Sequence, residues 1–277
     1  MTSKSKTKPD GVLTAGGVLD RIVDAKSIRL ADAKRSMPLE QIIALMSPND
    51  HRSFAESLAK PERVNIIAEI KHRSPSKGII REDFNPVAIA ESYEQAGAAA
   101  MSVLAEEDFF GGSLDYLRAI RERVNAPLLR KDFIFDEYQI YESVAAGADA
   151  VLLIVAVLDD ELLERLIGLA NETGLDALVE VHTADEMKRA TLAGARIIGV
   201  NNRDLATFAV DLNTSFQLAQ LAPASATLVS ESGIRTGEDI RNLKSAGFSS
   251  FLIGEHFMRA ENPGDALKQL ADDVCVS

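Results

Sequence analysis

The dipeptide Ala-Gly recurs at a nearly constant spacing along most of the chain. Its four copies are Ala96-Gly97, Ala146-Gly147, Ala193-Gly194 and Ala246-Gly247, whose glycines lie 50, 47 and 53 residues apart. Each pair follows an amphipathic stretch with helical spacing and precedes a short run of apolar residues. Glycine is the expected residue just after a helix, because it adopts the left-handed conformation without a steric penalty. The repeat therefore predicts four units, each containing a helix that leads into a strand.

Two predicted strands fall within each repeat. The eight predicted strands are 64–71, 98–104, 126–131, 148–154, 176–181, 195–201, 227–230 and 248–253. Strands that alternate with helices at this spacing form a parallel sheet. Eight such units predict a closed (β/α)₈ TIM barrel, an α/β fold, and an open doubly wound sheet is the competing architecture. No Gly-x-Gly-x-x-Gly string follows the first strand, which disfavours the open sheet.

The 277 residues are predicted to form one barrel domain at 12–277, since a single α/β barrel commonly reaches this size. No linker rich in Pro, Gly or Ser interrupts the repeat. Residues 12–62 show helical spacing but carry too little apolar surface for an independent domain, so we expect a helical extension that packs on the barrel. Residues 1–11 are polar and are predicted to be a disordered tail. No second domain is expected, which predicts a monofunctional chain.

Charge and cysteine content narrow the class of partner. The formal charge of −12 disfavours nucleic acids and anionic membranes. No apolar run is long enough to span a bilayer, and the basic N-terminal residues lack the apolar segment of a secretory signal. Cys275 is the single cysteine, which excludes an internal disulfide and fits a reducing cytoplasm. The four histidines have no metal-ligand spacing, and neither a metal nor a cofactor is expected.

Charged residues stand at the carboxyl ends of the predicted strands, where barrels of this type build their active sites. The first strand ends in Glu69 and Lys71, which share one face because side chains alternate along a strand. Later strands contribute Lys131, Glu180, Asn201, Arg203 and Glu231. Three cations and three anions at one mouth can compensate one another while single pKa values are displaced, as acid–base chemistry requires. A ring of structural ion pairs is the alternative interpretation.

The loops beyond these strands contain groups that suit an anion and an aromatic ring. Ser74 lies in a basic, hydroxyl-rich loop after the first strand, at 73–78. Ser232 and Gly233 follow the seventh strand and Gly254 follows the eighth, where backbone N–H groups and a short helix at 255–258 can hold a phosphate. Two aromatic residues can flank a flat apolar ring or belong to the core; they are Phe110 and Phe133.

An ordered set of short strings runs along the chain at 68–71 with 74–78, 106–113, 129–133, 179–181, 199–205 and 230–234. This set resembles the indole-3-glycerol phosphate synthase family of tryptophan biosynthesis. Each string is weak alone, but together they run through every predicted active-site loop, and the N-terminal extension is also similar. The resemblance implies a TIM-barrel carboxy-lyase without a cofactor. Its reaction closes 1-(2-carboxyphenylamino)-1-deoxyribulose 5-phosphate to indole-3-glycerol phosphate, with loss of carbon dioxide and water.

The resemblance also implies roles at matching positions. Lys131 is similar to the general acid that protonates the ketone oxygen, and Glu180 to the group that stabilises the developing positive charge. Glu69 and Lys71 are similar to the pair that handles a second proton transfer. The residues that resemble groups orienting the substrate are Ser74, Asn201, Arg203 and Glu231, and Ser232, Gly233 and Gly254 fall where the family holds its phosphate. Asn201 and Ser232 are counted with the catalytic set, and Phe110 and Phe133 join the binding set from their own placement.

Two further expectations concern charge. Lys131 is expected to have a lowered pKa, because it lies in an enclosed site beside other cations. Glu255 stands where many relatives have Ser in the phosphate loop, and we expect its carboxylate to turn away from the phosphate so that only backbone amides bind it.

Other interpretations remain open at this stage. Phosphoribosylanthranilate isomerase shares the barrel and the phosphate site, but it works with a Cys/Asp pair and Cys275 is the single cysteine here. A non-catalytic phosphosugar-binding barrel is the third. The expected partner is a phosphorylated aromatic-sugar substrate, and association with other tryptophan-pathway enzymes is a further expectation from the resemblance.

Overall fold

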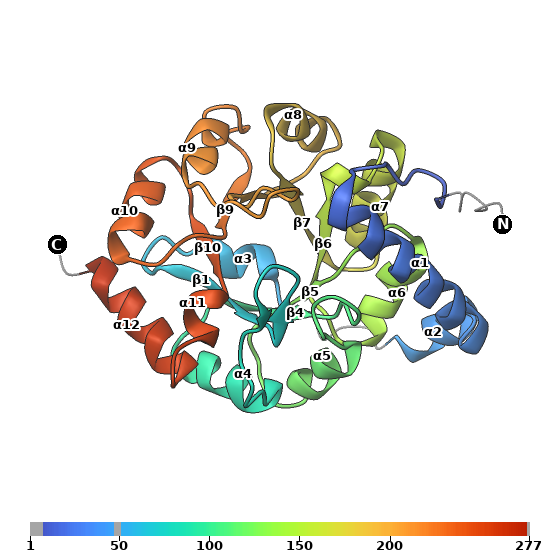
Figure 1. Ribbon diagram of the computed structural model, residues 1–277, viewed down its shortest axis with the longest axis horizontal. Coiled ribbons are helices and arrows are strands. Elements are labelled where there is room, and N and C mark those ends of the chain that lie inside the picture. The colour runs from blue at the N-terminus through green and yellow to red at the C-terminus, as the bar shows by residue number, and fades with distance from the viewer. Residues whose placement is uncertain (1–7, 47–50, 276–277) are drawn as a thin grey trace.

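The computed structural model describes residues 8–46 and 51–275, which fold around a closed barrel of eight parallel strands (Figure 1). Each strand pairs with its neighbour in the sequence, and β1 closes the cylinder by pairing with β10 as well as with β4. The predicted TIM barrel is confirmed. The barrel strands are β1 (Asn65–Ile70), β4 (Ala100–Leu104), β5 (Leu128–Lys131), β6 (Ala150–Ile154), β7 (Asp176–Val181), β8 (Ile197–Asn201), β9 (Thr227–Glu231) and β10 (Ser250–Ile253).

Helices surround the barrel on its outside (Figure 1). They are α4 (Pro86–Gln95), α5 (Leu114–Arg121), α6 (Glu137–Ala145), α7 (Asp160–Glu172), α8 (Ala184–Leu192), α9 (Asn213–Ala219), α10 (Gly237–Ser245), α11 (Glu255–Met258) and α12 (Pro263–Cys275). The predicted strands agree with these bounds to within two residues at each end. The sequence reading missed a small hairpin, β2 (Arg73–Ser74) with β3 (Gly78–Ile79), and the 3₁₀ turn η1 (Val155–Val157).

The Ala-Gly repeat has the structural basis that the sequence predicts. Gly97, Gly147, Gly194 and Gly247 follow α4, α6, α8 and α10, and all four have a positive φ between 79° and 104°. All four helices that lead into these glycines also begin at a side-chain cap, which is Asn85 for α4, Asp136 for α6, Thr183 for α8 and Thr236 for α10. Such caps accept hydrogen bonds from otherwise unpaired backbone N–H groups. Local signals therefore determine both ends of these helices.

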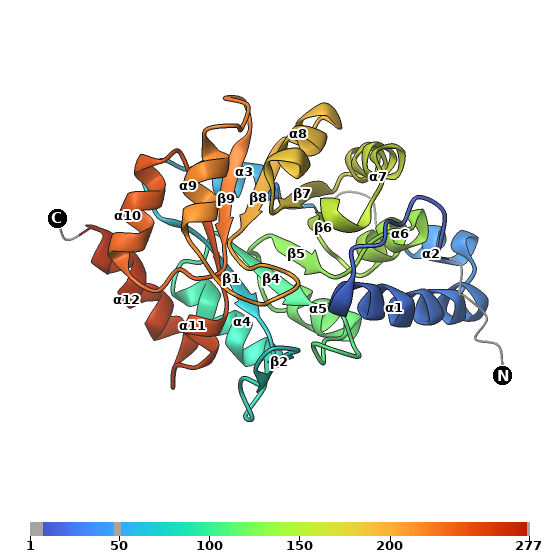
Figure 2. The ribbon, with the colours of Figure 1, turned by 45° about the horizontal axis from the view of Figure 1, so that its top comes forward.

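The N-terminal extension consists of α1 (Gly17–Ser36), α2 (Leu39–Leu45) and α3 (Phe54–Leu58). α1 and α2 lie beside α6 on the outside of the barrel (Figures 1 and 2). α3 packs under the barrel, where Phe54 and Leu58 are fully buried and the backbone oxygen of Leu58 accepts a hydrogen bond from Ser250. The extension thus covers the outside of the barrel near α6 with α1 and α2, and the underside of the barrel with α3.

The predicted disordered tail, residues 1–11, overlaps the described residues at 8–11. These four residues lie against the body instead of forming a loose tail: Lys8 Nζ is 2.5 Å from Asp20, and the backbone oxygen of Gly11 accepts a hydrogen bond from Asp159 N at 2.8 Å. Residues 1–7 lie outside the described part. In the residues that the structure describes, no helix is both long and apolar enough to cross a membrane.

Candidate active site

A cavity of about 480 Å³ opens at the carboxyl ends of the barrel strands. The topology explains its composition, because parallel strands all deliver their last inward residues to the same mouth. Its lining contains every residue that the sequence predicts for the site: Glu69, Lys71, Ser74, Phe110, Lys131, Phe133, Glu180, Asn201, Arg203, Glu231, Ser232, Gly233 and Gly254. The structure thus brings the whole predicted set together, while their individual roles remain proposals.

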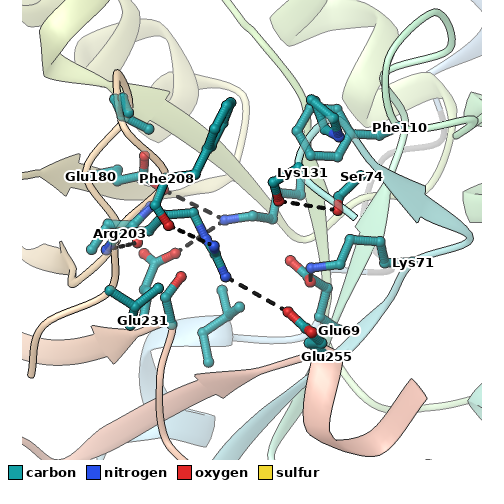
Figure 3. A pocket seen from close by; sticks show the side chains of 18 of the residues that line it. Glu69, Lys71, Ser74, Phe110, Lys131, Glu180, Arg203, Phe208, Glu231 and Glu255 are labelled. Carbon is teal, nitrogen blue, oxygen red and sulfur yellow. Dashed lines mark hydrogen bonds and ion pairs between the residues drawn. The ribbon is translucent and has the colours of Figure 1, made fainter. Parts of the chain in front are cut away.

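The ammonium of Lys131, at the end of β5, lies between two carboxylates (Figure 3). Its Nζ is 3.0 Å from Oε2 of Glu231 on β9 and 3.5 Å from Oε2 of Glu180 on β7. Both carboxylates are buried, as is Glu69 on β1. Lys131 therefore sits as a cation inside a buried anionic group.

The pKa of Lys131 is raised, and the expectation that it is lowered is wrong. Burial acts to lower this pKa, but the charges of Glu231, Glu180 and Glu69 outweigh it. The sequence argument counted neighbouring cations, whereas the fold places the carboxylates closer. An ammonium with a raised pKa carries its proton throughout the neutral pH range, so Lys131 is available as a proton donor.

The two carboxylates beside Lys131 have opposite pKa displacements. Burial raises the pKa of Glu231 to about 7, assisted by the charges of Glu180 and Glu69 and opposed by Lys131. Burial would also raise the pKa of Glu180, but Lys131 and then His182 lower it to about 2. Titratable groups whose environments separate their pKa values in this way are typical of acid–base sites.

Glu69 and Lys71 form a second charged pair across the cavity from Glu180 (Figure 3). Lys71 Nζ donates a hydrogen bond to Glu69 Oε1, as their shared strand face predicts. Burial acts to raise the pKa of Glu69, but Lys71, Lys131 and Arg203 lower it overall. A Cβ at Gly254 would overlap the Glu69 carboxylate, so glycine there leaves room for this group.

Arg203 connects the loop after β8 to the far side of the cavity. Its Nη1 donates to the backbone oxygen of Phe208 at 3.2 Å, and its Nη2 is 3.8 Å from Glu255 Oε2. Glu255 lines the cavity instead of turning out of it, but its Oε1 accepts a hydrogen bond from Arg259 at 3.0 Å. The carboxylate is thus held by two arginines. Whether it avoids a bound phosphate stays a prediction.

Aromatic and aliphatic side chains form the apolar wall. The rings of Phe110 and Phe133 lie 6.4 Å apart between centroids, and both line the cavity. The buried carboxylate of Glu106 holds this loop in place. It accepts hydrogen bonds from the backbone N–H groups of Asp108, Phe109 and Phe110. Val18, Leu19 and Ile22 of α1 complete the apolar wall, which was not predicted from the sequence. The apolar stripe along this helix was the sequence feature that could have indicated it.

The backbone is strained at the proposed phosphate site. Ser232 has φ 67° and the following Gly233 has φ 88°. Among the described residues, the non-glycine positions with positive φ are Ser232 and Phe208, and both line the cavity. Such conformations are costly for non-glycine residues and concentrate at functional sites. This strain could not be read from the sequence.

His182 is a residue whose place beside the site the sequence reading did not recognise. It lies directly after β7, and its Nε2 is 3.4 Å from Glu180 Oε1. The available signal was its spacing of two residues from Glu180, which puts both on one strand face. Elsewhere in the described residues, no three potential metal-ligating side chains gather into a group that could hold an ion.

Comparisons with known proteins agree with this geometry. The family model described as indole-3-glycerol phosphate synthase matches residues 19–270. A relative of that name from Desulfotalea psychrophila is 46% identical over 254 residues, covering 91% of this chain and 98% of the relative. Another, from Thermoanaerobacter sp., is 50% identical over 257 residues, covering 93% and 98%. The chain belongs to the indole-3-glycerol phosphate synthase family.

Membership of the indole-3-glycerol phosphate synthase family makes the chain a carboxy-lyase of tryptophan biosynthesis, EC 4.1.1.48, and does not favour the isomerase alternative. Solved structures of other barrels are similar in fold alone. The 3-hexulose-6-phosphate synthase from Salmonella typhimurium superimposes with a TM-score of 0.62 at 14% identity, covering 76% of this chain and 99% of that structure. This likeness supports the barrel and carries nothing about chemistry.

Proposed function

We propose that this indole-3-glycerol phosphate synthase uses Lys131 as the general acid that starts ring closure. The substrate is 1-(2-carboxyphenylamino)-1-deoxyribulose 5-phosphate, and the products are indole-3-glycerol phosphate, carbon dioxide and water. The observation that carries the proposal is the partly buried ammonium of Lys131, held between the buried carboxylates of Glu180 and Glu231 at the mouth of the barrel. No other lysine among the described residues makes ion pairs with both of these carboxylates.

In the first step, the ring carbon that bears the carboxyl group attacks the ketone carbon. Lys131 donates its proton to the ketone oxygen, so that the new carbon–carbon bond forms as the C=O bond becomes C–OH. The aromatic ring loses an electron pair to this bond, and positive charge develops on the ring and its nitrogen. Glu180 is ionised at neutral pH and stabilises this charge inside a buried site, where electrostatic effects are strong.

In the second stage, the bond to the carboxyl group breaks, and its electron pair returns to the ring as carbon dioxide leaves. The new hydroxyl then leaves as water with a second proton, and the carbon next to nitrogen loses one proton. The reaction thus takes up one net proton, because two reach the oxygen and one leaves carbon. Glu69 and Lys71 are hydrogen-bonded to each other at this mouth, which supports them as the pair for these transfers.

The rest of the cavity suits the two ends of the substrate. Phe110 and Phe133 form an apolar slot that fits the aryl ring. Gly233, Gly254 and the backbone of Ser232 are proposed to bind the phosphate, with Ser74 and Arg203 orienting the chain between. Asn201 holds the start of the Arg203 loop, because its Oδ1 accepts a hydrogen bond from Arg203 N at 3.0 Å.

The test is product formation by the wild type and by Lys131→Met. The chain has no tryptophan, so indole fluorescence reports the product against a low background. We expect turnover by the wild type and a loss of about 10²- to 10⁴-fold in the variant, the usual contribution of a general acid. Lys34→Met removes an exposed lysine of α1 and serves as the control. Full activity in Lys131→Met would sink the assigned role, and no turnover by the wild type would sink the reaction.

Three wider statements are also proposals. We infer that residues 12–277 act as one domain, which the packing of α3 under the barrel supports. We place the enzyme in the cytoplasm, which the single, exposed cysteine supports. Association with other tryptophan-pathway enzymes is tested by sedimentation of the purified chain with each purified enzyme, where unchanged sedimentation in every mixture would contradict it.

A further inference from the structure

The imidazole of His182 lies between two carboxylates, one of which belongs to the proposed catalytic set. Its Nε2 is 3.4 Å from Oε1 of Glu180, and its Nδ1 is 3.1 Å from Oε2 of Glu186. The side chain is 11% exposed, so water does little to screen these contacts. A buried ring with a carboxylate at each nitrogen is stabilised in its doubly protonated, cationic form.

The first turn of α8 holds the ring in this place. Thr183 caps the helix, and its Oγ1 accepts a hydrogen bond from Glu186 N at 3.2 Å. The carboxylate of Glu186 folds back and accepts a hydrogen bond from the backbone N–H of His182 at 2.7 Å. The same Oε2 also contacts the imidazole of His182, so one side chain holds both the backbone and the ring of this residue.

Three carboxylates interact with His182. Glu180 faces it from β7, Glu186 from α8, and Asp204 from the loop after β8, where the charge of His182 contributes to lowering the pKa of Asp204. Burial acts to lower the pKa of His182, but Glu180 and Glu186 raise it to about 10. His182 is therefore a cation across the neutral pH range.

His182 and Lys131 share Glu180 from opposite ends of its carboxylate. His182 approaches Oε1 and Lys131 approaches Oε2, at 3.4 Å and 3.5 Å. The resulting series alternates in charge, running Glu186, His182, Glu180 and Lys131. The two cations are not equivalent in the reaction, because Lys131 lines the cavity and gives up its proton in the proposed first step, whereas His182 is not among the residues that line the cavity.

We propose that His182 is a positioning residue that keeps Glu180 ionised and aimed at the substrate at the moment when Lys131 loses its charge. The inference rests on the proposed role of Lys131 as the acid. Once the proton of Lys131 has moved to the ketone oxygen, Glu180 loses the cation at Oε2. The cation at Oε1 then prevents the carboxylate from taking up a proton, and it remains negative opposite the positive charge that develops on the substrate ring.

The direct test follows the ionisation of Glu180 without using activity. The carboxyl carbon of Glu180 is titrated by ¹³C NMR in Lys131→Met and in Lys131→Met combined with His182→Asn. Lys131→Met mimics the stage at which the ammonium has lost its charge. We expect Glu180 to stay ionised down to acid pH in the single variant and to titrate at least about one pH unit higher in the double variant. If Glu180 titrates at the same pH in the single and the double variant, the proposal is overturned.

Kinetics provide the second test, in the otherwise unaltered enzyme. His182→Asn should lower kcat about tenfold with little change in KM, and should move the acid limb of the kcat profile to higher pH. His182→Lys restores a cation and should recover part of kcat. His51→Asn is the matched control, because His51 also lies near a buried carboxylate, 4.0 Å from Asp149, outside the cavity. An unshifted acid limb in His182→Asn would count against the proposal.

Glu186→Gln covers the case in which His182→Asn fails to fold. The variant keeps the shape of the side chain but removes one of the anions that hold the charge on His182. The basic limb of the kcat profile should then move to lower pH, and an unmoved limb would contradict the proposal. The outcomes distinguish this inference from the proposed function. If the wild type shows no turnover, the proposed reaction is refuted. If the wild type is active but the His182 and Glu186 variants have the same pH profiles as the wild type, only this inference is refuted.

Discussion

Glu231 shows how burial converts an ordinary side chain into a group that titrates near neutral pH. Its pKa is raised to about 7 by burial, with Glu180 and Glu69 adding to the shift. The native protein therefore keeps a proton that the unfolded chain releases above about pH 4.5. Because the native state binds more protons in this window, the free energy of unfolding falls as pH rises from about 4.5 to about 7.

This linkage predicts a pH-dependent difference between the wild type and Glu231→Gln. On going from about pH 5 to about pH 8, the wild type should lose stability relative to the variant, by at most about 3 kcal/mol at about 1.4 kcal/mol for each pKa unit. Urea unfolding at both pH values measures it. Glu255→Gln is the control, because the pKa of Glu255 is lowered from 4.5, so its contribution is lost only as pH falls below about 4.5 and should not change between about pH 5 and about pH 8. If the difference in the free energy of unfolding between the wild type and Glu231→Gln is the same at both pH values, the raised pKa of Glu231 is contradicted.

Gly199 predicts a second effect at the residue scale. A Cβ at this position of β8 would overlap the carboxylate of Glu231. Gly199→Ala should therefore displace this carboxylate from Lys131, with a loss of stability of about 1–3 kcal/mol and a fall in kcat/KM. Gly168→Ala in α7 is the matched control, because its Cβ meets open space and alanine favours a helix by about 1 kcal/mol. Equal kinetics in the two variants would count against the packing argument.

At the scale of elements, α1 is joined to the site by a buried ion pair. Lys26 of α1 is 2.9 Å from Asp132, which lies directly between Lys131 and Phe133. The side chain of Lys26 is 5% exposed and that of Asp132 is fully buried. Arg130 also binds Asp132, so the residue after the proposed acid is held from two directions. The extension is thus a structural support of the mouth as well as part of its apolar wall.

Lys26→Met should be costly because it leaves the buried Asp132 without one of its cations. We expect a loss of about 3 kcal/mol in the free energy of unfolding, the usual cost of removing one partner from a buried pair. Lys34→Met removes an exposed lysine from the same helix, paired with Asp136, and should change stability by less than about 1 kcal/mol. Urea unfolding compares them, and similar losses in both would show that the burial of Lys26 adds nothing.

At the scale of the whole molecule, the closing contact joins segments from opposite ends of the barrel sequence. Asn65 of β1 lies opposite Ser250 of β10, and Asn65 Nδ2 also donates to the backbone oxygen of Ser249. A closed barrel has no free edge strand, so we expect it to open as one cooperative unit. Hydrogen exchange in increasing urea should give β1, β6 and β10 the same opening free energy. Earlier exchange of β10 would show that the closing seam opens separately.

Much of the fold and of the site could be predicted from the sequence, because the signals are local. The glycines after helices, the apolar runs of the strands and the polar residues at their ends each depend on a few neighbouring residues. The two-residue spacing of Glu69 and Lys71 predicts their contact, and the spacing of Glu180 and His182 carried the same information. The attachment of residues 8–11 was missed, since it depends on surfaces that meet only in the folded chain, and the hairpin β2–β3 was missed because its strands have two residues each.

The sequence by itself determined the family, the barrel and the charged residues at the strand ends that line its mouth, because the period of two in strands and the repeated helix ends predict which side chains point inward. Only the tertiary structure decided the charge states of those residues. The pKa of Lys131 is raised where the sequence predicted a lowered one, since its pKa depends on the distances to carboxylates from β7 and β9, far away in the chain. Electrostatic interactions vary with distance and burial, and both are set when the strands close into a barrel.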